Sequence, residues 1–340
     1  MKQNFLSEKR VLTGITTSGT PHIGNLIGAI LPAIKASKKN DVSSFLFLAD
    51  YHSLIKKHDP ILTHRSSFEV AACWLACGLD PNKTTFYRQS DIPHIMELAW
   101  ILGCITAKGL LNRAHAYKAA VAENDEQKIK DPDKGIMMGL FNYPILMSAD
   151  ILAFNVHEVP VGQDQKQHLE MTRDIANRFN YLYESTFVIP EAVISDQSGI
   201  LPGIDGKKMS KSYGNTIPIF CECKKLEKLI KKIKTNSLEP GEPKDSKNCT
   251  VFRIYKAFAD GDATTNMEVK YKNGISWGQA KNELIDLIEN RIQPFREEYL
   301  KICDDRGYVE KILKDGAEKA MDISSPILHR IRKLVGIQNF

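Results

Sequence analysis

The segment of residues 14–25 has the composition of a phosphate-binding turn. It reads GITTSGTPHIGN, follows an apolar strand pattern at residues 11–14 and leads into a helical pattern that begins at Gly24. Helix N-termini attract anions, and glycines allow a nucleotide close to the backbone. The segment lacks both the lysine of a P-loop and the glycine spacing of a dinucleotide-binding turn. Because a histidine at a helix start is more often a cap than a catalyst, His22 needs support from a second motif.

A lysine-rich loop at residues 207–212, KKMSKS, provides that support. Lysines and small hydroxyls on a loop flanked by glycines can hold a polyphosphate that is being transferred. A lysine cluster alone is usually solvated surface. The two segments together indicate chemistry on a polyphosphate.

Asp150 is a carboxylate in an otherwise apolar helical stretch, MSADIL at residues 147–152. Met147 lies three residues earlier, on the same helix face. A carboxylate among such neighbours is costly unless a donor satisfies it. That donor can belong to the partner in a structural ion pair or to a substrate.

Strand and helix patterns alternate through the first half of the chain and predict an α/β fold with a parallel sheet. We expect strands at residues 11–14, 44–49, 84–88 and 156–161. We expect helices at residues 24–38 (with a kink at Pro32), 63–77, 92–105, 136–153 and 164–179. The polar residues 112–135 are predicted to form a mobile connection.

Beyond residue 215 the patterns are helical, after a loop at about 203–216. Residues 224–234 read KKLEKLIKKIK, whose apolar residues share one helix face while the lysines form either a binding surface or a solvated one. Further helices are predicted at residues 277–292, 294–303, 308–315 and 322–335.

Composition sets the class of protein. A chain of 340 residues allows about two domains, and the net charge of +5 permits a polyanionic partner. No apolar run approaches the roughly 18 residues of a membrane helix, and the N-terminus lacks the apolar region of a signal peptide. The seven scattered cysteines, including Cys221 and Cys223, lack zinc-site spacing and suggest reduced thiols.

The two motifs resemble those of the class I aminoacyl-tRNA synthetases. Residues 22–25 (HIGN) are similar to the HIGH motif, and residues 208–212 match KMSKS letter for letter. Residues 143–152, 159–180 and 14–25 resemble the bacterial tryptophanyl-tRNA synthetases in particular. The likeness is strong over residues 10–215 and weaker in the helical tail, where GAEKA at residues 316–320 also fits.

The resemblance implies a Rossmann-like, HIGH-type catalytic domain at residues 1–214, with a connective insertion at about 108–155. Residues 215–340 would form an all-helical domain that binds the tRNA anticodon. The implied catalytic residues are His22 and Asn25, which contact the ATP phosphates, and Lys208 and Lys211, which hold the leaving pyrophosphate. The implied ATP-binding residues are Thr16, Thr17, Ser18, Gly24, Asn25, Gly162, Gln163, Asp164, Ile200, Leu201, Lys208, Met209, Ser210, Lys211 and Ser212.

The resemblance also implies a tryptophan pocket. Tyr143 and Gln165 would meet the α-amino group, and Asp150 would accept the indole N–H, which is the ring's one donor. The implied tryptophan-binding residues are Gly14, His52, Tyr143, Met147, Asp150, Val159, Val161 and Gln165.

The chain departs from the family pattern at a few positions. Leu12 and Thr16 stand where well-known members have Phe and Gln, and Asn25 ends a motif that often ends in His. Two alternatives are a tyrosyl enzyme, which residues 159–180 disfavour, and an inactive RNA-binding relative. The intact His22 and Asp150, with both motif lysines, disfavour the latter.

The implied function is that of a tryptophan–tRNA ligase. Such an enzyme activates L-tryptophan with ATP to tryptophanyl-AMP and pyrophosphate, then esterifies the 3′-terminal adenosine of tRNA(Trp). The resemblance further implies Mg²⁺ bound with ATP and no dedicated metal site. It implies a cytoplasmic homodimer, without membrane association, whose two subunits are bridged by tRNA.

Overall fold

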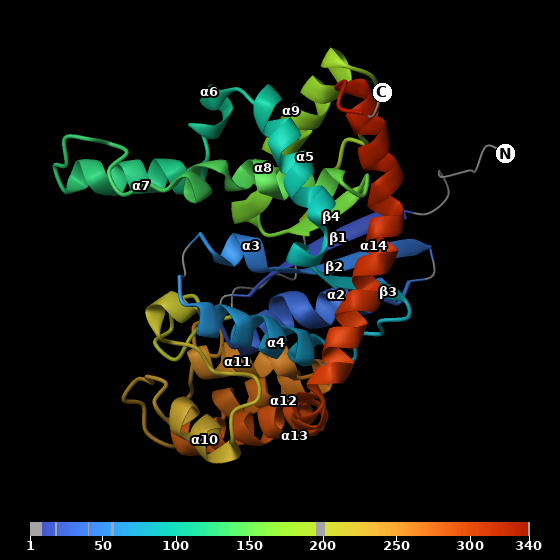
Figure 1. Cartoon of the computed structure of the whole chain (residues 1–340). Coiled ribbons are helices and arrows are strands. Elements are labelled where there is room, and N and C mark those ends of the chain that lie inside the picture. Colours follow the sequence, from blue (N-terminus) through green and yellow to red (C-terminus); the bar gives the residue numbers. More distant parts are fainter. Residues whose placement is uncertain (1–8, 18, 40, 56–57, 195–200, 339–340) are drawn as a thin grey trace.

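The computed structural model describes residues 9–338, except residues 18, 40, 56–57 and 195–200. A five-stranded parallel sheet lies at its centre, in the order β3-β2-β1-β4-β5 (Figure 1). The strands are β1 (Lys9–Thr16), β2 (Val42–Ala49), β3 (Thr84–Arg88), β4 (Glu158–Val161) and β5 (Glu191–Ile194). The four predicted strands are confirmed. The sequence did not predict β5, a four-residue edge strand.

Helices cover both faces of the sheet, as an α/β fold requires. Alternate residues of β2 point to opposite faces, so that Leu46 and Leu48 join one core and Phe45 and Phe47 the other. The first core includes α4 (Pro60–Ala76), and the second includes α5 (Pro93–Ile105), α8 (Met138–Leu152) and α9 (Lys166–Leu182). These four helices were predicted.

The helix predicted at residues 24–38 consists of three pieces. A short α1 (Ile23–Asn25) passes into the π-helical turn η1 (Leu26–Ile30) and then α2 (Leu31–Ser37). Pro32 has no N–H to donate to the carbonyl four residues earlier, and it lies in the first turn of α2, where none is needed. The irregularity expected at the proline is thus a widened turn immediately before it.

The polar connection at residues 112–135 includes a helix that the sequence did not predict. It contains α7 (His115–Glu126), which none of the packed layers buries and which projects from the body in Figure 1. A short α6 (Lys108–Leu111) precedes it. With no apolar stripe to mark it, α7 resembled a polar loop in sequence.

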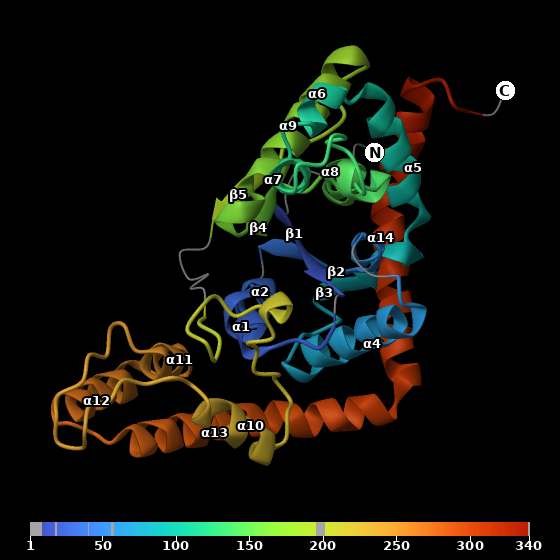
Figure 2. The ribbon, with the colours of Figure 1, turned by 90° about the vertical axis from the view of Figure 1, so that its left-hand side faces the viewer.

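The C-terminal half is helical, as predicted, but with longer helices. It comprises α10 (Cys223–Lys231), α11 (Thr250–Phe258), α12 (Gly261–Lys272), α13 (Trp277–Asp304) and α14 (Arg306–Leu334). The breaks predicted near Pro294 and at residues 316–321 are absent, since α13 and α14 each run through them. Figure 2 shows α13 along the base of the molecule and α14 rising from its end.

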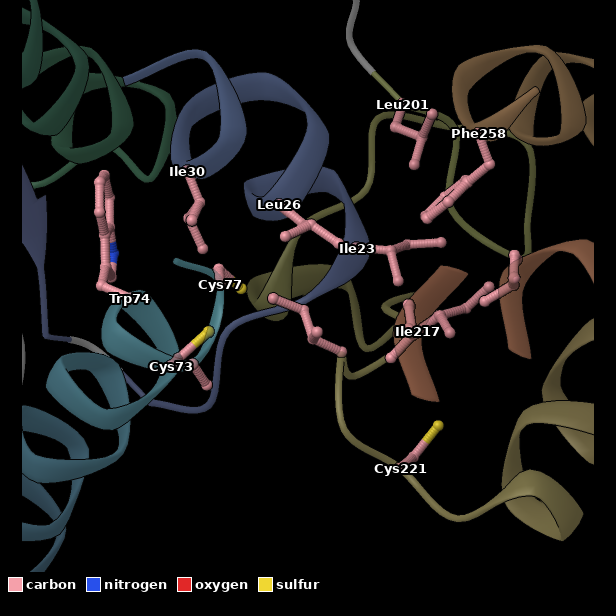
Figure 3. Close-up of a cluster of buried hydrophobic side chains, with 14 of the residues drawn as sticks. Ile23, Leu26, Ile30, Cys73, Trp74, Cys77, Leu201, Ile217, Cys221 and Phe258 are labelled. Atoms are coloured by element: carbon pink, nitrogen blue, oxygen red, sulfur yellow. The ribbon is translucent and has the colours of Figure 1, made fainter. Parts of the chain in front are cut away.

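Packing crosses the boundary expected at residue 215. Ile23 and Leu26 share one core with Ile217 and Phe258, in a cluster drawn in Figure 3. Beyond this core, α14 runs back along β3, the edge strand. A Cβ atom on Gly316 of α14 would lie 1.8 Å from the carbonyl oxygen of Phe86, so glycine allows this close approach. The sheet and the C-terminal helices therefore form one packed structure.

None of the described helices has the length and apolar content that a membrane span requires. Among the same residues, no group of three or more His, Cys, Asp or Glu side chains is arranged to hold a metal ion. All seven cysteines are free, with Cys221 buried and Cys223 exposed.

Candidate active site

The candidate site lies where the order of the strands reverses. From β1 the chain passes to β2 on one side, and from β3 it crosses to β4 on the other side of β1. At such a point a crevice forms at the strands' carboxyl ends. Two cavities of about 700 Å³ and about 590 Å³ open there. They share the lining residues Thr13, Gly14, Thr16, Gly28, Ala29 and Gly162. Molecules bound in the two cavities would therefore touch.

The smaller cavity brings together every residue that the sequence assigned to tryptophan. Its lining includes Gly14, His52, Tyr143, Met147, Asp150, Val159, Val161 and Gln165. They come from β1, the short helix α3 (Asp50–Ser53), α8, β4 and the turn η3 (Gln163–Gln165). Gly14 is needed for space, because a Cβ atom there would lie 2.9 Å from Cζ of Phe47.

Asp150 is 1% exposed, and each of its carboxylate oxygens has a partner. Nε2 of His52 lies 2.9 Å from Oδ2, and Nε2 of Gln89 donates to Oδ1 at 2.7 Å. Burial raises the pKa of Asp150, and the hydrogen bonds from His52 and Gln89 oppose that rise. A carboxylate offers about four acceptor positions, so this group can still accept a hydrogen bond from a ligand in the cavity.

A second chain of polar groups joins Gln165 and Tyr143, which also line this cavity. Nδ1 of His168 lies 3.1 Å from Oε1 of Gln165, which can only accept, so Nδ1 carries the proton. Nε2 of His168 then accepts from the hydroxyl of Tyr143 at 2.5 Å. Burial raises the pKa of Tyr143 to about 12, which keeps this hydroxyl protonated. The phenolic oxygen retains lone pairs that could receive an ammonium group.

The larger cavity brings together most of the predicted ATP-binding residues. Its lining includes Thr16, His22, Gly24, Asn25, Gly162, Gln163, Leu201, Lys208, Met209, Ser210 and Lys211. Thr17 and Ser212 do not line it. Thr17 is buried with its hydroxyl 2.8 Å from that of Ser53, and Ser212 is exposed and bonded to Ser210. Ser18, Ile200 and the side chain of Asp164 lie outside the described residues.

His22 both caps α1 and faces the larger cavity. The backbone N–H of Asn25 donates to its Nδ1 at 3.3 Å, and the Asn25 side chain accepts from the backbone N–H of His22 at 3.1 Å. Burial, and then the Lys211 charge, lower the pKa of His22 to about 4. The ring is therefore neutral at pH 7, with its proton on Nε2. Such a ring can donate to a phosphate oxygen.

The lysine loop is held by Asn215, which is 2% exposed. Its Oδ1 accepts from the backbone N–H of Ser210 at 2.8 Å, and its Nδ2 donates to Asp205 at 2.7 Å and to the carbonyl of Lys208 at 3.0 Å. Nζ of Lys211 donates to the carbonyl of Gly19 at 2.6 Å, which joins this loop to the first motif.

The charge of the larger cavity favours anions. Lys208 and Lys211 line it, and none of its described lining side chains is a carboxylate. The described lining could therefore bind a polyphosphate, and a divalent ion arriving with it would be held by the phosphate oxygens.

Three residues of this arrangement were not predicted. Gln89 and Asn215 hold Asp150 and the lysine loop, and His168 links Gln165 to Tyr143. The i, i+3 spacing of Gln165 and His168 is a usable signal, because residues three apart share a helix face. Gln89 gave no local signal, since its partner lies in a different part of the chain.

Comparison with known proteins identifies the family. The family model described as tRNA synthetases class I (W and Y) matches residues 6–293. The tryptophan–tRNA ligase of Neisseria meningitidis is 54% identical over 98% of this chain and 99% of its own length. That of Pseudomonas syringae is 52% identical over 97% of this chain and 74% of its own length.

Solved structures agree. The crystal structure of the tryptophanyl-tRNA synthetase from Campylobacter jejuni, complexed with ADP and tryptophan, superimposes with a TM-score of 0.87. The two are 40% identical, over 96% of this chain and 99% of the other. The predicted resemblance and fold class are confirmed, and the chain belongs to the class I tRNA synthetases of the tryptophan and tyrosine group.

Proposed function

We propose that this chain is a tryptophan–tRNA ligase. In the first step the tryptophan carboxylate attacks the α-phosphorus of ATP, and the bond to pyrophosphate breaks to give tryptophanyl-AMP. In the second step a terminal ribose hydroxyl of tRNA attacks the acyl carbon, and AMP leaves. The two adjoining cavities with Gly14 and Thr16 in common support this proposal above all, because they would place carboxylate and α-phosphate side by side.

The chain's residues would act mainly by position and charge. Tyr143 and Gln165 would hold the ammonium group while Asp150 accepts the indole N–H. His22 would donate from Nε2 to a phosphate oxygen. Lys208 and Lys211 would neutralise the departing pyrophosphate, and Lys211 has three N–H donors to share between the carbonyl of Gly19 and phosphate oxygens. Mg²⁺ would enter with ATP and lower the charge that these lysines meet.

The direct test is ATP–pyrophosphate exchange with each of the twenty amino acids in turn. We expect exchange with tryptophan alone, followed by aminoacylation of tRNA(Trp). Exchange that depends on tyrosine would instead identify a tyrosyl enzyme. Activity with none of the twenty would indicate a protein that only binds RNA.

We propose that the helical region binds the tRNA anticodon. On α10, Leu226 and Ile230 are buried, so the lysines face solvent. Charge reversal of Lys228 and Lys232 should weaken aminoacylation at limiting tRNA severalfold, and the deficit should shrink at higher salt, because salt already weakens the lysine–phosphate contacts of the parent. Unchanged aminoacylation would reject this surface but not the reaction.

We propose that the chain acts as a homodimer in the cytoplasm. Met96 and Met137 line a third cavity of about 760 Å³ beside Trp100, which is 75% exposed. Exposed apolar surface of this kind is typical of a subunit interface. Trp100→Glu should yield monomers in light scattering, whereas Tyr181→Glu, at an 85% exposed position on α9, should remain dimeric. The free cysteines suit a reducing compartment.

A further inference from the structure

The two partners of Asp150 come from two very short elements. His52 belongs to α3, and Gln89 to the 3-10 turn η2 (Gln89–Asp91). Single turns of this length do not hold their shape alone, because helix nucleation is unfavourable. Contacts from elsewhere must therefore fix both side chains against the carboxylate.

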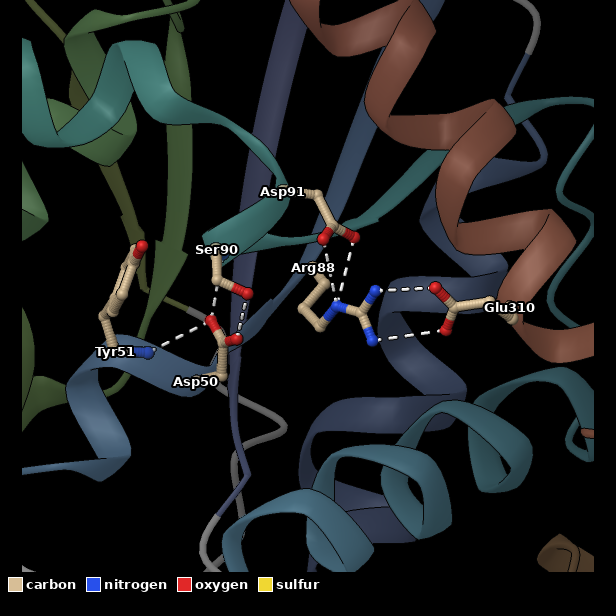
Figure 4. A network of polar contacts seen from close by, with 6 residues as sticks. All are labelled: Asp50, Tyr51, Arg88, Ser90, Asp91 and Glu310. Carbon is tan, nitrogen blue, oxygen red and sulfur yellow. Dashed lines mark hydrogen bonds and ion pairs between the residues drawn. The ribbon is translucent and has the colours of Figure 1, made fainter. Parts of the chain in front are cut away.

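Asp50 joins the two elements directly. Its Oδ1 accepts from the backbone N–H of Ser90 at 3.1 Å and from that of Tyr51 at 3.1 Å. Its Oδ2 accepts a short hydrogen bond from the Ser90 hydroxyl. Asp50 precedes His52 by two residues and Ser90 follows Gln89 by one, so these bonds tie together the turns that carry both partners (Figure 4).

Arg88 anchors the same turn from its other side. Its Nε donates to both carboxylate oxygens of Asp91, at 3.2 and 3.1 Å. Its terminal nitrogens donate to Glu310 of α14 at 3.3 and 2.9 Å, as Figure 4 shows. With η2 fixed on α14, the bonds of Asp50 tie the first residue of α3 to η2, while Ser53 at the other end of α3 bonds to Thr17.

We propose that Asp50 and Ser90 are positioning residues for tryptophan selection, which hold His52 and Gln89 on Asp150 so that its remaining lone pairs face the indole N–H. This inference rests on the proposed role of Asp150. Without the bonds from Asp50 to Ser90, α3 is no longer tied to η2, and His52 and Gln89 are no longer held together on the carboxylate of Asp150. Loss of these bonds therefore lowers kcat/KM more for a substrate whose ring donates a hydrogen bond than for one whose ring cannot.

The test compares kcat/KM in pyrophosphate exchange for tryptophan and for its analogue with sulfur in place of the ring N–H. Asp50→Ala should lower the ratio of the two about tenfold, the scale of one lost hydrogen bond. The loss should appear in the KM of tryptophan, with the KM of ATP unchanged. Asp50→Asn, which keeps an acceptor for the backbone N–H groups, should restore part of the ratio.

Asp59→Ala is the matched control. Asp59 lines the same 890 Å³ cavity as Asp50 but caps α4, where its Oδ1 accepts from the backbone N–H of Leu62, so its loss should leave the ratio unchanged. Should Asp50→Ala fail to fold by circular dichroism, Ser90→Ala removes only the hydroxyl and should lower the ratio about threefold.

The outcomes separate this inference from the role of Asp150. An equal loss for both substrates in the folded Asp50 and Ser90 variants would overturn the positioning role. If Asp150→Ala meanwhile abolishes the discrimination between tryptophan and the sulfur analogue, the proposed hydrogen bond from the indole N–H to Asp150 still holds. Discrimination that survives Asp150→Ala would overturn both. If both hold, adding Asp50→Ala to Asp150→Ala should change the ratio no further.

Discussion

The cavity around Asp150 and the loop that carries Lys211 open onto one crevice but are built differently. Asp150 is buried, and both of its oxygens are bonded to side chains that other elements hold in place. Lys211 is exposed, and its ammonium group bonds to the carbonyl of Gly19. The first site has its polar geometry before a ligand arrives, whereas the charged group of the second stands exposed on a loop that bonds to the backbone of the first motif.

This difference separates selection from rate. A carboxylate that is already oriented needs little reorganisation on binding, so it can favour one substrate over another in the ground state. An exposed lysine on a loop contributes most when charge develops on a leaving group. Changes in the cavity should therefore alter which amino acid is used, and changes in the loop how fast it reacts.

Lys211→Ala should produce the largest effect and would break the comparison on the loop side. Exchange should slow by roughly 10²–10³, the scale of one aimed electrostatic group. Tryptophan binding, measured by equilibrium dialysis, should change little, because this lysine acts on pyrophosphate. An exchange rate within threefold of the parent would contradict the assigned role.

Asp150→Ala tests the cavity side. We expect a lower kcat/KM for tryptophan. The loss of transition-state stabilisation should be about 2–4 kcal/mol, the scale of a charged hydrogen bond whose partner is left unmet. Stability should fall in thermal unfolding, since the buried amide of Gln89 and the ring of His52 lose their acceptor. The preference over the sulfur analogue should nearly vanish. A preference that persists would mean that another residue accepts the indole N–H.

Asn215→Ala should have a smaller effect and would sharpen the comparison. The variant loses the three bonds that shape the lysine loop. Exchange should slow about tenfold, the scale of one net hydrogen bond, because the loop then holds its lysines less firmly. The KM of tryptophan should stay unchanged. Tyr213→Phe, which alters an exposed hydroxyl on the same loop, serves as control. A raised KM for tryptophan would show that the loop also shapes the cavity.

Local patterns predicted much of the fold and of the crevice. The buried strand β2 and the acid within the apolar helix α8 were visible because each depends on neighbours in sequence. The bond between Asp50 and Ser90 was not, since it joins residues 40 apart, and His168 reaches Tyr143 across 25 positions. The course of α14 was hidden for the same reason. Gly316 has a meaning only beside Phe86, from another part of the chain.

The position of α14 along β3 also bears on how the chain folds as it is made. Synthesis runs from the N-terminus, so the strands of the sheet leave the ribosome well before α14. Until then, β3 presents the unpaired backbone groups of an edge strand, to which a strand of another chain can add. A nascent chain is thus open to aggregation at this edge until α14 has emerged and packed against β3.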